Sequence, residues 1–128
     1  TVDRLVAAVG AESGSPLAVF QIRHLGAAFA TGSETEGAAG HIDAPYQLFA
    51  LGIPAVPALV EPIRASLDRV ELAVAPVSSG TTTPNFLRAG GDVDRCWPAD
   101  VRARLRAIKA DADPLGTIRS NRPVLHTH

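Results

Sequence analysis

Methionine is absent from the 128-residue chain, and aromatic residues are few: four phenylalanines, one tryptophan and one tyrosine. The single cysteine, Cys96, excludes an internal disulfide and a zinc site built from cysteines. So few aromatic rings argue against the stacking platforms that bind single-stranded nucleic acids. No apolar run approaches the roughly 18 to 20 residues of a membrane-spanning helix. The sequence predicts a chain with one modest hydrophobic core.

Charge is nearly balanced, with twelve Lys and Arg against thirteen Asp and Glu and a net charge of −1. This balance argues against nucleic acid or an anionic membrane as the main partner. The missing methionine and the start at Thr1 predict a fragment or a processed product. Eleven of the twelve basic residues are arginine, and this bias is typical of a G+C-rich, bacterial coding sequence. Without a signal-peptide pattern, we expect a cytoplasmic location.

The hydrophobic pattern predicts helices over residues 3–9, over residues 61–74 and from Pro98 onward. Residues 16–25 and 44–52 are predicted strands, and a small polar loop over residues 30–40 lies between them. No helix separates the strands, so we expect an antiparallel pair. The expected fold class is α+β, an antiparallel β-sheet with helices packed on one face. Residues 1–76 and 77–128 are expected to form one compact unit.

Alternation assigns each residue of the first strand to a face. One face is uniformly apolar and suits packing against the helix over residues 61–74: Ala18, Phe20 and Ile22. The other face begins apolar and becomes polar, with Leu17, Val19, Gln21 and Arg23. On the second strand, Gln47 is flanked by Phe49 and Leu51. Polar groups in an apolar face suit ligand binding, so Gln21, Arg23 and Gln47 are candidate substrate-binding residues, although ordinary half-solvated sheets show the same alternation.

No self-contained catalytic set can be built from the remaining residues, so the catalytic residues are unknown at this point. The four histidines, His24, His41, His126 and His128, lack metal-ligand spacing, and no metal site is predicted. Neither a phosphate-binding glycine loop nor a nucleophile elbow occurs. Cys96 beside Trp97 is interpreted as a packed thiol with nothing nearby to depress its pKa. The arginines of the last helix are interpreted as a solvated face.

One pattern in the second half is more specific. GTTTPNF, followed by WPADVRARLRAIKADADPLGTIRSNRPV, resembles the C-terminus of berberine-bridge-type FAD-linked oxidases of the vanillyl-alcohol-oxidase superfamily. In that family an Asn-Phe or Asn-Tyr pair precedes a helix R-L-x-x-I/V-K-A, then D-P, then F/I-R-x-N-x-P. The matching positions are Asn85-Phe86, Arg104-Leu105, Ile108-Lys109-Ala110, Asp113-Pro114, Ile118-Arg119, Asn121 and Pro123. Upstream, IRHLGAA at residues 22–28 is similar to the family strand R-x-x-G-G-A, and residues 41–53 with the following helix also fit its substrate domain.

The resemblance implies that residues 1–76 are the distal half of a substrate-binding domain and residues 77–128 a C-terminal segment that returns to the flavin. Asn85 and Phe86 are then the cofactor-binding residues. FAD would be bound mainly by an N-terminal domain outside this chain, and a small-molecule substrate would pass a hydride to it, with oxygen as the usual acceptor. The isolated chain is predicted to be inactive. Its uncovered sheet face predicts a homo-oligomer.

Two positions depart from the family pattern. Thr83 stands where many members have a tyrosine, and its hydroxyl is too weak an acid to replace a phenol, which leaves the proton acceptor open. Ala27 stands where a second glycine is common. The alternative interpretation is a stand-alone α+β ligand-binding or dimerisation domain without catalysis. A bound flavin would distinguish the two.

Overall fold

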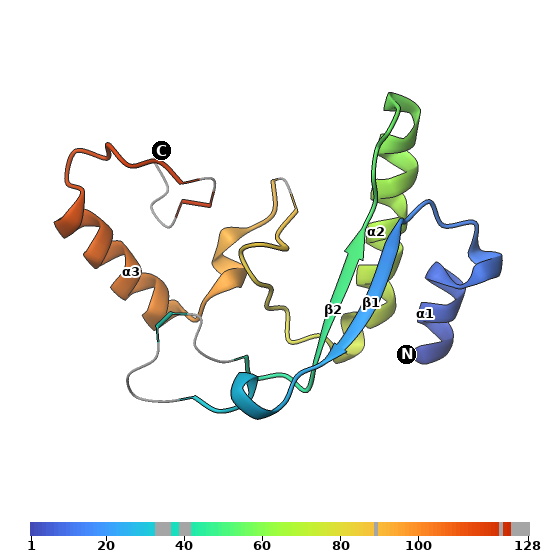
Figure 1. The fold of residues 1–128 in the computed structure, drawn as a ribbon, viewed down its shortest axis with the longest axis horizontal. Coiled ribbons are helices and arrows are strands. Elements are labelled where there is room, and N and C mark those ends of the chain that lie inside the picture. Colours follow the sequence, from blue (N-terminus) through green and yellow to red (C-terminus); the bar gives the residue numbers. More distant parts are fainter. Residues whose placement is uncertain (33–36, 39–41, 89, 121, 124–128) are drawn as a thin grey trace. The chain divides into compact units, whose positions relative to one another are not determined.

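The computed structural model describes residues 1–32, 37–38, 42–88, 90–120 and 122–123 (Figure 1). In these ranges it contains the helices α1 (Val2–Val9), α2 (Val60–Val74) and α3 (Ala99–Ala112) and the strands β1 (Val19–His24) and β2 (Tyr46–Leu51). The two strands form one antiparallel sheet, which confirms the α+β class. No helix in the described part of the chain is long and apolar enough to cross a membrane.

The chain divides into two compact units. Unit 1 comprises Thr1–Ala30 and Asp43–Ser79, and unit 2 comprises Thr31–Ile42 and Gly80–His128. The expected division after residue 76 lies close to the end of unit 1, but residues 31–42 group with the C-terminal part instead. That the two parts combine into one compact unit stays a prediction.

Proline and glycine residues lie at or near the ends of the helices, close to the boundaries that the sequence predicts. The Gly10 amide closes α1 by donating to the Val6 carbonyl at 2.8 Å. Pro62 lies in the first turn of α2, where its missing N–H costs no hydrogen bond. Pro98 caps the start of α3, and Arg102 N donates to its carbonyl at 3.0 Å. The helix boundaries therefore agree with the expected ones to within a residue or two.

The β-hairpin of unit 1 pairs from Val19 with Leu51 to His24 with Tyr46. Both strands are shorter than expected from residues 16–25 and 44–52. Part of the predicted loop, residues 33–36 and 39–40, lies outside the described residues. The antiparallel pairing is confirmed.

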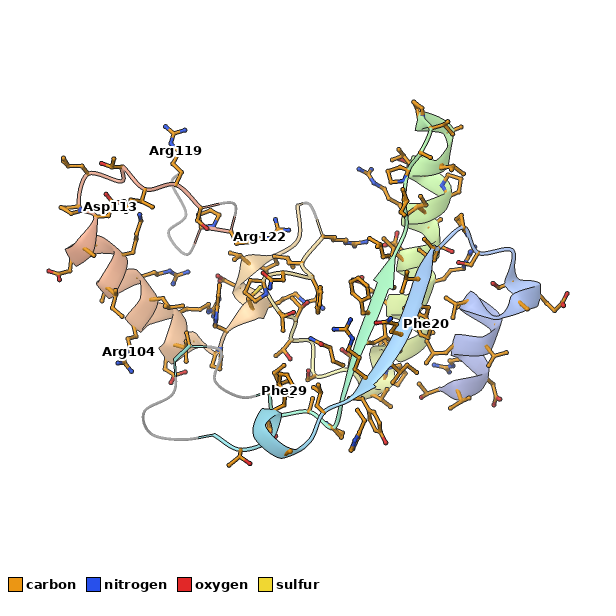
Figure 2. The ribbon with its side chains drawn as sticks, viewed as in Figure 1. Phe20, Phe29, Arg104, Asp113, Arg119 and Arg122 are labelled. Carbon is orange, nitrogen blue, oxygen red and sulfur yellow. The ribbon has the colours of Figure 1, made fainter. Side chains whose placement is uncertain are left out.

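The core of unit 1 lies between α1, α2 and one face of the hairpin. Its buried residues are Leu5, Ala8, Val70 and Ala73, and Val9, Leu17, Phe20, Leu48 and Val74 pack against them. Phe20, labelled in Figure 2, therefore faces the helices, as expected. Ile22 on the same face is 56% exposed, so the helices cover only part of it. Leu17 was expected on the opposite face, but it packs in the core because it precedes β1, where strand alternation does not apply.

A buried polar contact fixes the segment before β1 to α2. Ser66 is fully buried, and its hydroxyl lies 2.8 Å from the Ser15 hydroxyl and accepts a 2.8 Å hydrogen bond from Arg69 Nη2. Ser15 Oγ also accepts from the Leu17 amide at 3.4 Å. These bonds offset the cost of burying a hydroxyl and explain a serine within the apolar stripe of α2.

In unit 2, several basic residues of α3 form ion pairs. Asp94, in the 3₁₀ turn Val93–Cys96, forms an ion pair with Arg102 and a second with Arg106 Nη2 at 3.4 Å. Lys109 pairs with Asp113 at the end of the helix. Arg102 and Arg106 thus have an acidic partner in Asp94, whereas Arg104 is exposed as a solvated helix face requires.

Asp113 organises the turn that follows α3. Its carboxylate accepts hydrogen bonds from the amides of Thr117 at 2.8 Å and Ile118 at 2.9 Å, besides the Lys109 ammonium. Lys109 Nζ also donates to the Ile118 carbonyl at 2.7 Å. The Lys109 and Ile118 hydrogen bonds hold the pKa of Asp113 below its usual range. The cap is therefore complete at neutral pH and is lost only as the pH falls through that lowered pKa.

Acid titration should show this lowered pKa at the turn. We expect the Thr117 and Ile118 amide NMR signals to move with one midpoint below the usual aspartate range, because both amides donate to the Asp113 carboxylate. Asp113→Asn should abolish that transition, whereas the control Asp111→Asn, at an exposed position of the same helix, should leave it unchanged. A midpoint at or above the ordinary aspartate value would contradict the assignment.

Candidate functional site

The three predicted substrate-binding residues share one face of the hairpin. In the β1–β2 register Gln21 lies opposite Phe49, and Arg23 lies opposite Gln47. This face is the one opposite Phe20 and Leu48, which pack into the core of unit 1. Gln21 and Arg23 are exposed, and Gln47 is half-buried. The structure thus brings the three residues together, and their role in binding stays a prediction.

Arg23 is oriented by its neighbours on this face. Its Nε and Nη2 donate to Gln21 Oε1 at 3.2 and 2.9 Å. Its guanidinium carbon lies 5.5 Å from the centre of the Phe49 ring, within cation–π range. The result is a guanidinium held against an aromatic ring, with amides on both strands. Such a surface offers apolar area together with a few directed donors.

The second candidate site is the turn that carries Asn85 and Phe86 in unit 2. The amides of Phe86 and Leu87 both donate to the Thr83 carbonyl, at 3.0 and 3.1 Å, which closes the turn. Asn85 is exposed and Phe86 is 39% exposed, so both predicted cofactor-binding residues reach the surface of the unit. Their contact with a cofactor stays a prediction.

Arg122 holds this turn from the C-terminal tail (Figure 2). Its guanidinium donates to the Pro84 carbonyl at 3.4 Å and to the Leu87 carbonyl. Sequence reasoning missed Arg122 because it occupies a variable position of the tail pattern. No local sequence pattern predicts that Arg122 contacts Leu87 and Pro84, which lie 35 and 38 positions earlier in the chain.

Thr83 does not present its hydroxyl at the surface. The Thr83 Oγ1 atom is buried and has no hydrogen-bond partner among the described residues. The expectation that Thr83 does not replace the tyrosine of the resembled oxidases stays a prediction.

A hollow of about 560 Å³ lies beside the turn in unit 2. It is lined by Pro84, Asn85, Trp97, Ser120 and Arg122. Next to Trp97, burial raises the pKa of the half-buried Cys96 thiol, while the cations Arg122 and Arg95 act to lower it without overcoming burial. The expectation that nothing nearby would depress this pKa is therefore wrong, because two arginines act to lower it. Burial has the larger effect, so the thiol stays protonated.

The histidines show no common site. His24 ends β1, is exposed and lies with its ring 5.3 Å from that of Tyr46. His41, His126 and His128 lie outside the described residues. In the described ranges, no three His, Cys, Asp or Glu side chains gather as a metal site would require.

Comparison with known proteins adds no relative: no family model, no curated protein and no solved structure matches the chain.

Proposed function

We propose that the chain is the substrate-side, C-terminal portion of an FAD-dependent oxidoreductase that passes a hydride from an organic substrate to flavin, with oxygen as the electron acceptor. One observation carries the proposal: Arg122, in the tail, bonds to both sides of the Asn85-Phe86 turn. The tail that carries the last part of the oxidase-like pattern is therefore bonded to the turn that carries its Asn-Phe pair, and this supports the proposal. A cytoplasmic location belongs to the same proposal.

The backbone conformation at Ala27 also supports the proposal, although the residue itself departs from the family pattern. This residue has φ +49°, in the left-handed region that favours glycine, and it stands where the resembled oxidases commonly have glycine. A glycine, as in the resembled oxidases, would adopt this left-handed backbone conformation without strain. An alanine at this position carries a strain that a glycine would relieve.

Ala27→Gly is accordingly expected to raise the free energy of unfolding by about 0.5 to 1 kcal/mol, because relief of the left-handed strain outweighs the entropy of the added glycine. The matched control is Ala30→Gly, at φ −92°, which should destabilise by up to about 1 kcal/mol. Urea denaturation followed by circular dichroism measures both. Equal changes in the two variants would remove this support.

The residues present fit contacts with one edge of a flavin rather than with the whole cofactor. The exposed Asn85 amide suits the polar ring atoms, and the partly exposed Phe86 ring suits the apolar edge. The sequence has no glycine-rich phosphate loop, so the rest of FAD belongs to the N-terminal domain proposed as partner. When bound, the flavin supplies the hydride-accepting chemistry, and this chain positions the substrate.

Substrate orientation is the role proposed for the open sheet face. Arg23 is held by Gln21 and Phe49, so its guanidinium has a preferred direction before a substrate arrives. Preorganised donors of this kind lower the entropic cost of binding. Gln47, opposite Arg23 in the register, adds an amide on the neighbouring strand.

The decisive experiment is to purify the complete reading frame that contains this chain and record its absorption spectrum. We expect flavin bands that bleach when an oxidisable substrate is added without oxygen and return when oxygen is admitted. A colourless, flavin-free full-length protein would overturn the proposal. The isolated 128-residue chain should bind FAD weakly and show no oxidase activity.

In that full-length protein, Gln21→Ala and Arg23→Ala should each lower kcat/KM by about tenfold, through a lost hydrogen bond to substrate or a misdirected guanidinium. Arg64→Ala is the matched control, because Arg64 is an exposed arginine of the same unit that pairs only with Glu61 in the contacts seen. Thermal unfolding should change little in all three. Wild-type kinetics in both sheet variants would refute the assignment of this face.

A second candidate is a stand-alone dimerisation domain, and exposed apolar side chains in unit 1 favour it. Val2 and Val6 of α1 are 72% and 61% exposed, and Leu72 of α2 is 72% exposed. Apolar surface of this kind promotes self-association. A flavin-free, full-length dimer in light scattering would support this candidate over the oxidoreductase, whereas a flavin-containing oligomer agrees with the first proposal and its expected homo-oligomer.

A further inference from the structure

The hollow of unit 2 has two half-buried apolar walls, Pro84 and Trp97. An indole ring and a pyrrolidine ring both offer flat surfaces, and an aromatic ring stacks on them at small entropic cost. The hollow has a volume of about 560 Å³, is half open to solvent, and exposes more polar than apolar surface. The walls therefore favour a small planar ligand over an extended or bulky one.

Arg122 is the charged side chain among the described residues of the lining. Among these described residues, the polar part comprises the guanidinium of Arg122, the amide of Asn85 and the hydroxyl of Ser120, and none of these three side chains carries a carboxylate. Hydrogen bonds to two backbone carbonyls fix the plane of the Arg122 guanidinium. A planar cation held in this way suits a carboxylate better than a neutral or cationic group.

The neighbouring thiol responds to the same positive charge. Arg122 acts to lower the pKa of Cys96, which directly precedes Trp97, so its field extends over this part of the unit. Burial nevertheless keeps the thiol protonated, and a neutral thiol does not repel an anion.

We propose that this hollow binds a small aromatic carboxylate, with the ring against Trp97 and Pro84 and the carboxylate at Arg122. The site lies wholly in unit 2, and the inference does not rest on the proposed oxidoreductase function. Asn85 and Ser120, both exposed at the hollow, complete the polar end by hydrogen bonding.

Trp97 is the only tryptophan, so its fluorescence reports directly on this hollow. The experiment titrates the whole chain with benzoate at constant ionic strength and compares it with benzamide, cyclohexanecarboxylate and acetate. We expect saturable quenching by benzoate, and apparent affinities about tenfold weaker for benzamide, which lacks the charge, and for cyclohexanecarboxylate, which lacks the aromatic ring. Equal affinity for benzoate and benzamide, or no saturable change with benzoate, would overturn the proposal without any variant being needed.

Two arginine variants then test the position of the carboxylate. Arg122→Gln should weaken benzoate binding by about tenfold and leave benzamide binding unchanged, because it removes the charge. The control is Arg119→Gln, whose side chain points away from the chain in Figure 2 and is exposed. Equal affinities for benzoate in the two variants would place the anion elsewhere and refute the site. Should Arg122→Gln loosen the turn, Ser120→Ala tests the same polar end and should weaken benzoate binding severalfold.

Discussion

Leu5→Ala is expected to lower the free energy of unfolding of unit 1 by about 2 to 4 kcal/mol. Leu5 is 8% exposed and packs in the core cluster with Ala8 of α1 and with Val70 and Ala73 of α2. Truncation removes buried apolar atoms and leaves a cavity beside small neighbours that cannot fill it. Urea denaturation followed by the NMR ring signals of Tyr46, the only tyrosine and a residue of β2, measures the effect in this unit.

The next residue of the same helix provides the matched control. Val6 is 61% exposed, so Val6→Ala should change the free energy of unfolding by no more than about 0.5 kcal/mol. A large effect at Val6 together with a small one at Leu5 would mean that α1 packs through the opposite face. The two positions lie in the same helix but on its buried and its exposed side, so the comparison tests mainly the effect of burial.

This pair also shows how far the sequence could predict the core. Helical spacing marks Leu5, Val6 and Val9 as apolar positions, but periodicity does not say which face meets α2. The structure selects Leu5 and Ala8, and alanine is too small to stand out as a core residue in a sequence. Helix ends were more predictable, because Gly10, Pro62 and Pro98 limit them by local backbone chemistry alone.

The contacts of the candidate sites were likewise only partly predictable from the sequence. Gln21 and Arg23 share a face by simple alternation, and antiparallel pairing adds Gln47 once the register is known. The ion pairs of Asp94 with Arg102 and Arg106, and the bonds from Arg122 to its turn, join segments that are distant in sequence. Such contacts depend on the tertiary fold, and for this reason composition and spacing predicted a solvated helix face instead.

Gly52, at the end of β2, is a position that no sequence pattern singled out, and we expect Gly52→Ala to destabilise unit 1 by about 1 to 3 kcal/mol. A Cβ atom there would lie 2.9 Å from Ile63 Cγ1 and closer still to Cγ2. Ile63 is 6% exposed and β-branched, so its side chain cannot turn away without disturbing the packing of α2 on the hairpin. The Tyr46 ring signals in urea again measure the loss.

The matched control is Gly26→Ala, which adds the same methyl group at another glycine of unit 1. Gly26 has an extended backbone, φ −159°, and a Cβ there would meet only His24 Cε1, at 3.6 Å, an ordinary contact. This variant should be neutral or stabilising by up to about 1 kcal/mol, because alanine reduces the entropy of the unfolded chain. Equal losses at both glycines would mean that the added methyl acts through the backbone and not through Ile63.

A double-mutant cycle with Ile63→Ala then identifies the cause of the Gly52→Ala loss. Ile63→Ala alone should cost about 2 to 4 kcal/mol, since it empties a buried site. Combined with Gly52→Ala, it removes the Cγ atoms that the new methyl group would strike, so the double variant should be more stable than the sum of the two losses by about 1 kcal/mol or more. Strict additivity would show that Gly52 and Ile63 act independently. The close approach of β2 to α2 would then not be the reason for glycine at this position.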